Sequence, residues 1–137
     1  MIIMSMAAAL LSTMNIWTAT PGHMRLHLND IYMALLMTGW MIFFDSLYHY
    51  NHYQNIFIPI ISFCFILFVI YLIRKQTFIN DRQFIKGMIP HHSMAILMAE
   101  KIKEKTKDKK IMELADNIIQ SQNKEIALME QYELNNS

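Results

Sequence analysis

The sequence has very little cysteine and almost no net charge. Its single cysteine, Cys64, lies inside an apolar run. An internal disulfide and a CxxC redox or metal motif are therefore excluded, and we interpret Cys64 as a small packed or lipid-facing residue. The formal net charge is only +1, so the chain lacks the basic excess of a protein that binds nucleic acid.

Charge is also nearly absent from the first half of the chain. Residues 1–73 contain one basic residue, Arg25, and two acidic residues, Asp30 and Asp45, whereas residues 74–137 contain eleven basic and nine acidic residues. The two halves therefore suit different solvents. We expect a membrane region over residues 1–77 and a soluble region over residues 78–137.

Two apolar runs in the first half are long enough to be transmembrane helices. Residues 56–73 contain no charge and are followed at once by Arg74 and Lys75, and about twenty apolar residues cross a bilayer as a helix. Residues 31–48 form the second expected span, with Asp30 as a candidate N-cap. Residues 2–17 are a weaker candidate helix. They lack the basic n-region of a cleaved signal peptide, so we expect a short or incomplete first span there.

The basic residues predict the orientation of these spans. The loop at 49–55 contains no lysine or arginine, whereas Arg74, Lys75, Arg82 and Lys86 follow the last span. The positive-inside rule then predicts a multi-pass integral membrane protein with a cytoplasmic C-terminal region. The opposite orientation stays open, and the expected partner of the first half is the lipid bilayer.

Four histidines and a row of methionines in this half have helical spacing. We interpret the pairs His23/His27 and His49/His52 as ordinary polar side chains at membrane edges, with metal chelation as the alternative. The row consists of Met33, Met37 and Met41. It is interpreted as packing, with a methionine-lined metal path as the alternative.

The second half predicts an antiparallel pair of helices, so the whole chain is expected to be all-α. The helices are expected at about 81–104 and 108–133, with Asn80 or Asp81 as the first N-cap and Asp108 as the second. Pro90 predicts a kink or a restart of the first helix. A pair of this size hides little apolar surface, so we expect it to dimerise or to pack on the membrane helices.

The periodicity also predicts which faces of the two helices are buried. On the first helix these residues are Phe84, Met88, His91, Ala95, Met98 and Ile102, opposite a polar face that includes Ser93. On the second helix they are Ile111, Leu114, Ala115, Ile118, Ile119, Gln122, Ile126 and Met129.

One segment of the first helix points to metal chemistry. His91 and His92 are adjacent, and Met88, Met94 and Met98 lie within seven residues of them. Imidazole nitrogen and thioether sulfur are ligands that copper(I) favours. If the hairpin turns near residue 107, His91 faces about residue 123 and Met88 faces about residue 126. Glu125 and Met129 then join the candidate ligands.

The same residues resemble the domain of unknown function 305 (DUF305) family. The matching pattern is Phe84-x3-Met88-Ile-Pro-His91-His92-x2-Ala95, followed by Gln122-x2-Glu125-Ile126-x2-Met129, and it covers about residues 78–133. The resemblance implies a ferritin-like helical bundle. It also implies copper or silver binding, carried by Met88, His91, His92, Met94, Met98 and Met129. No Glu-x-x-His pair supports di-iron chemistry.

These observations lead to two hypotheses. The first is a membrane-tethered protein that sequesters or transfers copper(I), or another soft metal such as silver, without catalysing a reaction. The second is a structural protein whose hairpin drives homo-oligomerisation without metal. The sequence contains no nucleophile–base pair, phosphate loop or paired buried carboxylates, so no enzymatic activity is expected. A metal-handling partner would be needed for transfer, and the sequence does not identify one.

Overall fold

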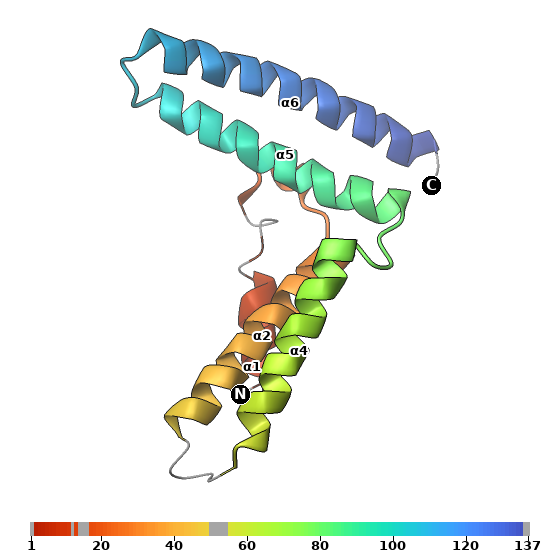
Figure 1. Ribbon diagram of the computed structural model, residues 1–137. Coiled ribbons are helices and arrows are strands. Elements are labelled where there is room, and N and C mark those ends of the chain that lie inside the picture. Colours follow the sequence, from red (N-terminus) through yellow and green to blue (C-terminus); the bar gives the residue numbers. More distant parts are fainter. Residues whose placement is uncertain (1, 12, 14–16, 50–54, 136–137) are drawn as a thin grey trace. The chain divides into compact units, whose positions relative to one another are not determined.

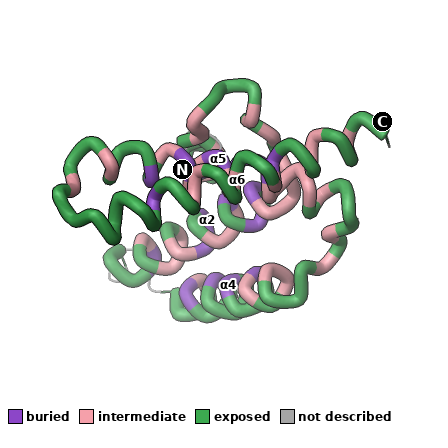
Figure 2. The backbone as a smooth tube through the Cα atoms, turned by 90° about the horizontal axis from the view of Figure 1, so that it is seen from above, coloured by how far each residue is buried: buried purple, intermediate pink, exposed green. Residues whose placement is uncertain are grey.

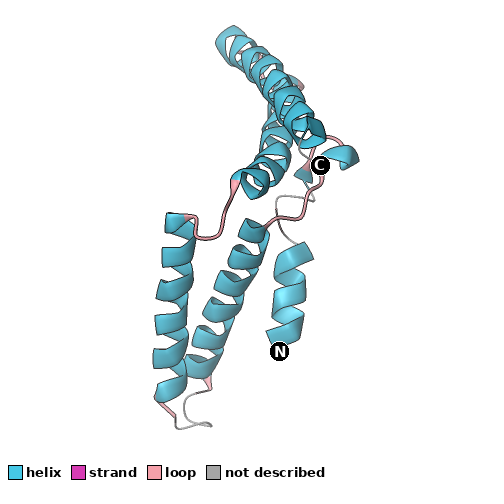
Figure 3. Ribbon diagram, turned by 90° about the vertical axis from the view of Figure 1, so that its right-hand side faces the viewer, coloured by secondary structure: helices cyan, strands magenta, loops and turns pink. Residues whose placement is uncertain are grey.

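The computed structural model describes residues 2–11, 13, 17–49 and 55–135, and these residues form helices and connecting loops without any strand (Figures 1 and 3). The elements are α1 (Ile2–Leu11), η2 (Pro21–His23), α2 (Leu28–Tyr48), α4 (Phe57–Lys75), α5 (Asp81–Lys103) and α6 (Lys109–Asn135). The expected all-α class is confirmed. The four long helices begin and end within about three residues of their predicted bounds. Of the candidate helix 2–17, the structure has Ile2–Leu11, and residues 12 and 14–16 lie outside the described residues.

The chain forms two compact units that do not follow the expected boundary at residue 77. The apolar unit contains Met1–Thr13 and Leu28–Ile79, and the hairpin unit contains Met14–His27 and Asn80–Ser137. The segment before α2 therefore packs with the charged half of the chain. Each unit is described by itself.

In the apolar unit, α2 and α4 are long and apolar enough to cross a membrane, and α1 is shorter. Most of the α2 and α4 surface faces outward, as it does in helices that are solvated by lipid. Gly39 allows a close approach between them, because a Cβ there would lie 2.9 Å from Cγ1 of the buried Ile66. Hydroxyl groups of the unit bond to helix carbonyls: Thr38 donates to the Ala34 oxygen and Ser62 donates to the Ile58 oxygen.

In the hairpin unit, α5 and α6 lie side by side and run in opposite directions (Figure 1). Asn80 caps α5 by accepting a hydrogen bond from the Gln83 amide at 2.9 Å. Asp108 precedes α6 and accepts from the Lys110 amide at 2.8 Å. The core contains Ile89, Ile96 and Ile126, and four partly buried residues pack against it: Ala19, Ile85, Ile119 and Met129.

The predicted buried face of α5 is wrong for four of its six residues, and the other two, Met88 and Ala95, are half-buried. Phe84, Met98 and Ile102 are 53%, 61% and 42% exposed, and His91 is exposed as well. The buried residues are instead Ile89, Pro90, Ser93, Ile96 and Ala99, and Figure 2 shows them as the purple parts of α5. The helix has two apolar faces, and periodicity does not tell which of them meets α6. Ser93, which we expected on the polar face, is fully buried.

The predicted buried face of α6 is partly right. Ala115 and Ile126 are buried, and Ile118, Ile119, Gln122 and Met129 are half-buried. Ile111 and Leu114 are exposed, which contradicts the prediction for these two residues.

Pro90 does not restart the first helix of the hairpin. The α5 helix runs without a break from Asp81 to Lys103 with Pro90 inside it. Proline removes one backbone hydrogen bond from a helix interior and crowds the preceding turn. Here its ring is completely buried, and this apolar contact offsets part of that cost.

Candidate metal centre

His91 and His92 occupy different environments although they are neighbours on α5. The His91 side chain is on the exposed face, whereas only 12% of the His92 side chain is exposed. Their ring centroids are 6.1 Å apart, and the ring planes are inclined by 58°. Successive residues on a helix point about 100° apart, so one imidazole points toward α6 and the other points away from the hairpin.

His92 meets Glu125 across the hairpin, about three residues from position 122, which the predicted register places opposite it. Its Nδ1 lies 3.0 Å from Oε2 of Glu125, but this buried nitrogen makes no hydrogen bond of acceptable geometry. The other Glu125 oxygen accepts a hydrogen bond from the Ser121 hydroxyl at 3.0 Å. The carboxylate is thereby held beside an imidazole nitrogen that lacks a hydrogen-bond partner.

Burial lowers the pKa of His92 below its usual value of 6.5. Desolvation is the largest cause, and the His91 ring acts in the same direction, whereas the Glu125 carboxylate opposes it. The imidazole is therefore neutral at pH 7. A neutral imidazole has the lone pair that a metal ion needs.

The methionines separate into three groups. Met88 and Met94 are half-buried and lie on α5 within one turn of His91, at spacings that bring side chains together. Met129 packs against the isoleucine core of the hairpin. Met98 is exposed and lines an apolar groove nearer the turn between α5 and α6. The structure thus brings His91, His92 and Glu125 to one level of the hairpin, and it separates Met98 and Met129 from them.

Within the part of the chain that the structure describes, no group of three or more histidine, cysteine, aspartate or glutamate side chains is arranged to hold a metal ion. A site at His91 and His92 in this unit would therefore need thioether ligands or ligands from a second molecule.

A polar network around Ser93 was not predicted. The Ser93 hydroxyl accepts a hydrogen bond from the Ala19 amide at 2.9 Å and lies 2.9 Å from Nδ1 of His23. That nitrogen is also 2.7 Å from the Thr20 hydroxyl, and Nε2 of His23 is 3.8 Å from Glu130. We had interpreted His23 as a loop residue at a membrane edge. Nothing in its local sequence indicates a partner 70 residues away.

Serine, histidine and glutamate are the residue types of a hydrolase triad, but this network does not have the properties of one. Ser93 is fully buried, so its oxygen cannot reach a substrate. One lone pair of its oxygen accepts from the Ala19 amide, and His23 is shared with Thr20. The network fastens the 17–27 segment to α5.

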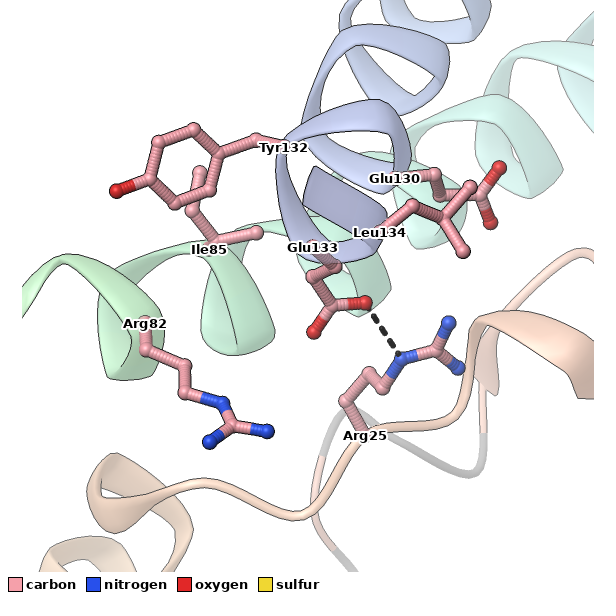
Figure 4. A pocket seen from close by; sticks show the side chains of 7 residues that line it. All are labelled: Arg25, Arg82, Ile85, Glu130, Tyr132, Glu133 and Leu134. Carbon is pink, nitrogen blue, oxygen red and sulfur yellow. Dashed lines mark hydrogen bonds and ion pairs between the residues drawn. The ribbon is translucent and has the colours of Figure 1, made fainter. Parts of the chain in front are cut away.

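A pocket of about 440 Å³ lies near the ends of α5 and α6 that are far from their turn (Figure 4). Its lining includes two cations, Arg25 and Arg82, and two anions, Glu130 and Glu133. Arg25 donates through Nε to Glu133 at 3.4 Å. Because the charges balance, the pocket favours neither anions nor cations, and it is not our candidate site.

Comparisons with known proteins agree with the pattern found in the sequence. The model of the domain of unknown function DUF305 matches residues 73–133. An uncharacterized protein of Acanthamoeba polyphaga mimivirus is 49% identical over 127 residues, which cover 92% of this chain and 84% of the viral protein. No solved structure matches the chain.

Proposed function

The chain belongs to the DUF305 family, and from this premise we propose that it is a membrane-tethered protein that binds a soft metal ion, copper(I) foremost, at His91 and His92. It sequesters the ion or hands it to a partner, and it catalyses no reaction. Silver(I), which has similar ligand preferences, is the second candidate ion. The two long apolar helices would anchor the protein in the lipid bilayer, with the hairpin unit in the cytoplasm as the charge pattern predicts.

The separation of the two imidazoles is the observation that carries this proposal. With metal–nitrogen bonds of about 2.0–2.1 Å, two rings bound to one ion have their centres roughly 5–6.5 Å apart. The observed separation of the ring centroids is 6.1 Å, so the rings are at the right distance, and the exposed His91 ring would have to turn about its side-chain bonds toward His92 for both to face one ion. Copper(I) accepts two nitrogen ligands and gains from thioethers nearby, and Met88 and Met94 lie within one turn of His91.

Glu125 supports the pair as an orienting group. A carboxylate beside one ring nitrogen fixes the tautomer of a ligating histidine and leaves the other nitrogen for the metal. In this structure Glu125 lies 3.0 Å from Nδ1 of His92 but forms no hydrogen bond of acceptable geometry with it. A small rotation of either side chain would let Nδ1 donate to Glu125, and Nε2 is then the expected ligand atom.

Competition for copper(I) tests the proposal. The full-length protein, purified in detergent micelles under reducing conditions, is titrated against a chromogenic copper(I) chelator. We expect His91→Ala/His92→Ala to lose at least about tenfold in affinity, since even outer ligands of a metal site are worth that much. His49→Ala is the matched control, because His49 is also exposed and also lies beside a carboxylate, Asp45. Equal affinities of the wild type and the double variant would rule the site out.

The second candidate function is homo-oligomerisation of a ferritin-like hairpin without metal. It is favoured by the exposure of apolar α5 residues such as Phe84, Met98 and Ile102. In this case His91→Ala/His92→Ala changes the oligomer or its melting temperature equally with and without copper. Sedimentation of both proteins with and without the metal separates the two functions.

A further inference from the structure

The hairpin unit has a second apolar seam, most of which lies outside the contact between α5 and α6. On α5 the seam contains Phe84, Met88, His91, Ala95, Met98 and Ile102, with spacings that alternate between four and three residues. On α6 it contains Ile111, Leu114, Ile118, Ser121, Glu125, Leu128 and Tyr132, with the same alternation. We call these residues the outer seam.

The outer seam has the pattern of a helical bundle interface. Strict alternation of three and four residues is the heptad repeat of helices that pack against other helices in a left-handed supercoil. Most large apolar residues of the seam nevertheless remain 42% to 61% exposed, and Met88 and Ile118 are half-buried. Near the turn of the hairpin the two helices enclose an apolar groove of about 570 Å³, which is lined by Met98, Ile102, Ile111 and Leu114 among others.

The polar residues of the outer seam are confined to its middle. They are His91, Ser121 and Glu125, and the positions toward both ends of the seam are apolar apart from the Tyr132 hydroxyl. A few polar residues in the middle of an apolar seam are a known device for fixing the register of paired helices. A second copy of the same hairpin therefore matches this surface, since its middle is polar and its ends are apolar at the same levels.

The charges at the two ends of the hairpin decide the direction of the second copy. Residues 101–110 contain six lysines against Glu104 and Asp108, a net charge of +4, whereas residues 125–135 contain three glutamates and no lysine or arginine, a net charge of −3. Arg25 offsets one of these glutamates, and Asp81, Arg82 and Lys86 at the start of α5 add a net charge of +1, so this end keeps a net charge of only −1. Parallel copies would bring two strongly basic turns together, whereas antiparallel copies bring each basic turn to the weakly acidic end.

We propose that two copies of this chain pair antiparallel through the outer seam, so that His91 of both copies flank the two-fold axis and complete one metal site. The α5 part of the seam is centred at residue 93, midway between Phe84 and Ile102. His91 is two residues away, about 3 Å along the helix. The pairing requires no metal, and only the shared site rests on the proposed function.

Disulfide cross-linking tests the pairing in the full-length protein. In the Cys64→Ala background, Phe84→Cys/Ile102→Cys places each new thiol level with the other thiol of the second copy. We expect this double variant to form covalent dimers on mild oxidation, and Phe84→Cys alone and Ile102→Cys alone to form none. A disulfide needs Cα atoms within about 7 Å, so Met88→Cys/Met98→Cys serves as a second pair at another level of the seam. Dimers from either single variant, or from neither pair, overturn the proposal.

Sedimentation in detergent gives an independent measurement. The wild type is expected to be a dimer, and Ile102→Glu/Leu114→Glu a monomer with unchanged helix content. Ala127→Glu introduces one negative charge at an exposed α6 position outside the seam and is expected to leave the dimer intact. A monomeric wild type contradicts the proposal.

The copper(I) titration then separates this inference from the proposed function. If a dimer shares the site, Ile102→Glu/Leu114→Glu lowers the copper(I) affinity although both histidines are present, and the wild type binds one ion per two chains. One ion per chain with unchanged affinity in this variant overturns the shared site but leaves metal binding intact. A dimer that binds no copper(I) overturns the proposed function but leaves the pairing intact.

Discussion

The two units of this protein are both helical, but their helices are held together in different ways. In the apolar unit charged side chains are few, and α2 and α4 approach closely where Gly39 has no side chain next to Ile66. In the hairpin unit the helices carry many charges, and burial is concentrated in a few isoleucines and in Ser93. The comparison teaches that a hydrophobic pattern can indicate the buried face of a helix only where polar residues occupy the other faces. Where most faces are apolar, the close approach of the backbones and the hydrogen bonds decide which faces meet.

The largest effect is expected from the core of the hairpin unit. Ile89→Ala removes a completely buried side chain and should lower the free energy of unfolding by about 2–5 kcal/mol. Phe84→Ala removes a larger side chain from an exposed position, and in a monomeric background such as Ile102→Glu/Leu114→Glu it should cost less than about 1 kcal/mol. Urea unfolding of both variants in that background, followed by circular dichroism, measures the difference. Similar losses would mean that the predicted α5 face is the buried one after all.

A smaller effect is expected in the apolar unit, where space rather than burial limits the contact. Gly39→Ala places a methyl group 2.9 Å from the Ile66 side chain, and overpacking of this kind costs about 1–3 kcal/mol. Ile66→Val, which shortens the opposing side chain, should restore part of the loss. Gly22→Ala is the control, since nothing lies within 4 Å of its Cβ. Thermal unfolding in micelles ranks the three variants by melting temperature. A Gly39→Ala variant as stable as the wild type would show that α2 and α4 can move apart at no cost in stability.

The hydrogen bonds of Ser93 should contribute about as much as one overpacked methyl group. Ser93→Ala leaves the Ala19 amide without its acceptor and His23 without one partner, and an unsatisfied buried group costs about 1–3 kcal/mol. Hydrogen exchange at the Ala19 amide should become much faster in this variant. Ser121→Ala removes an exposed serine hydroxyl, and exchange at Ala19 should not change in it. Unchanged protection of Ala19 in Ser93→Ala would contradict the network.

The smallest effect is a pH dependence confined to the hairpin unit. Because the pKa of His92 is lowered in the folded protein, the unfolded chain takes up a proton first as the pH falls. The contribution of His92 is therefore present above its unfolded pKa of about 6.5 and decreases as the pH falls below it. His92→Gln should flatten this part of the stability curve, measured by urea unfolding between pH 8 and pH 5. An identical slope in wild type and His92→Gln would contradict the assignment.

The sequence predicts the helices of both units well, because hydropathy, helix caps and the distribution of charge along the chain are local signals. Asn80 and Asp108 act at the helix starts where they were expected, and Glu125 lies near His92, at the level that the hairpin register predicts to within about three residues. The buried face of α5 was not predictable, since Phe84–Ile102 and Ile85–Ile96 both have helical apolar spacing. The choice between them depends on α6 and on the 17–27 segment, which are distant in sequence.

The candidate metal site illustrates the same limit. The adjacent histidines and their level on the hairpin follow from spacing and register. That Met129 belongs to the isoleucine core and that Met98 lines a separate groove depends on the tertiary packing. The engagement of His23 with Ser93 joins positions 70 residues apart, and no periodicity within one helix carries that information. Copper binding itself stays a prediction for the titration to decide.

The hairpin unit is built from two separate stretches of the sequence, and this restricts the possible membrane topologies of the chain. Residues 17–27 and 80–135 pack in one unit, so the stretch that connects them must return to the side of the membrane from which it departed. The number of crossings between His27 and Asn80 is therefore even: α2 and α4 cross together, or neither does. Ala19 is synthesised long before its partner Ser93. The hydrogen bond between them can therefore form only after the stretch that contains α2 and α4 has been synthesised. If these two helices cross the membrane, the bond then helps to hold both ends of that stretch on one side.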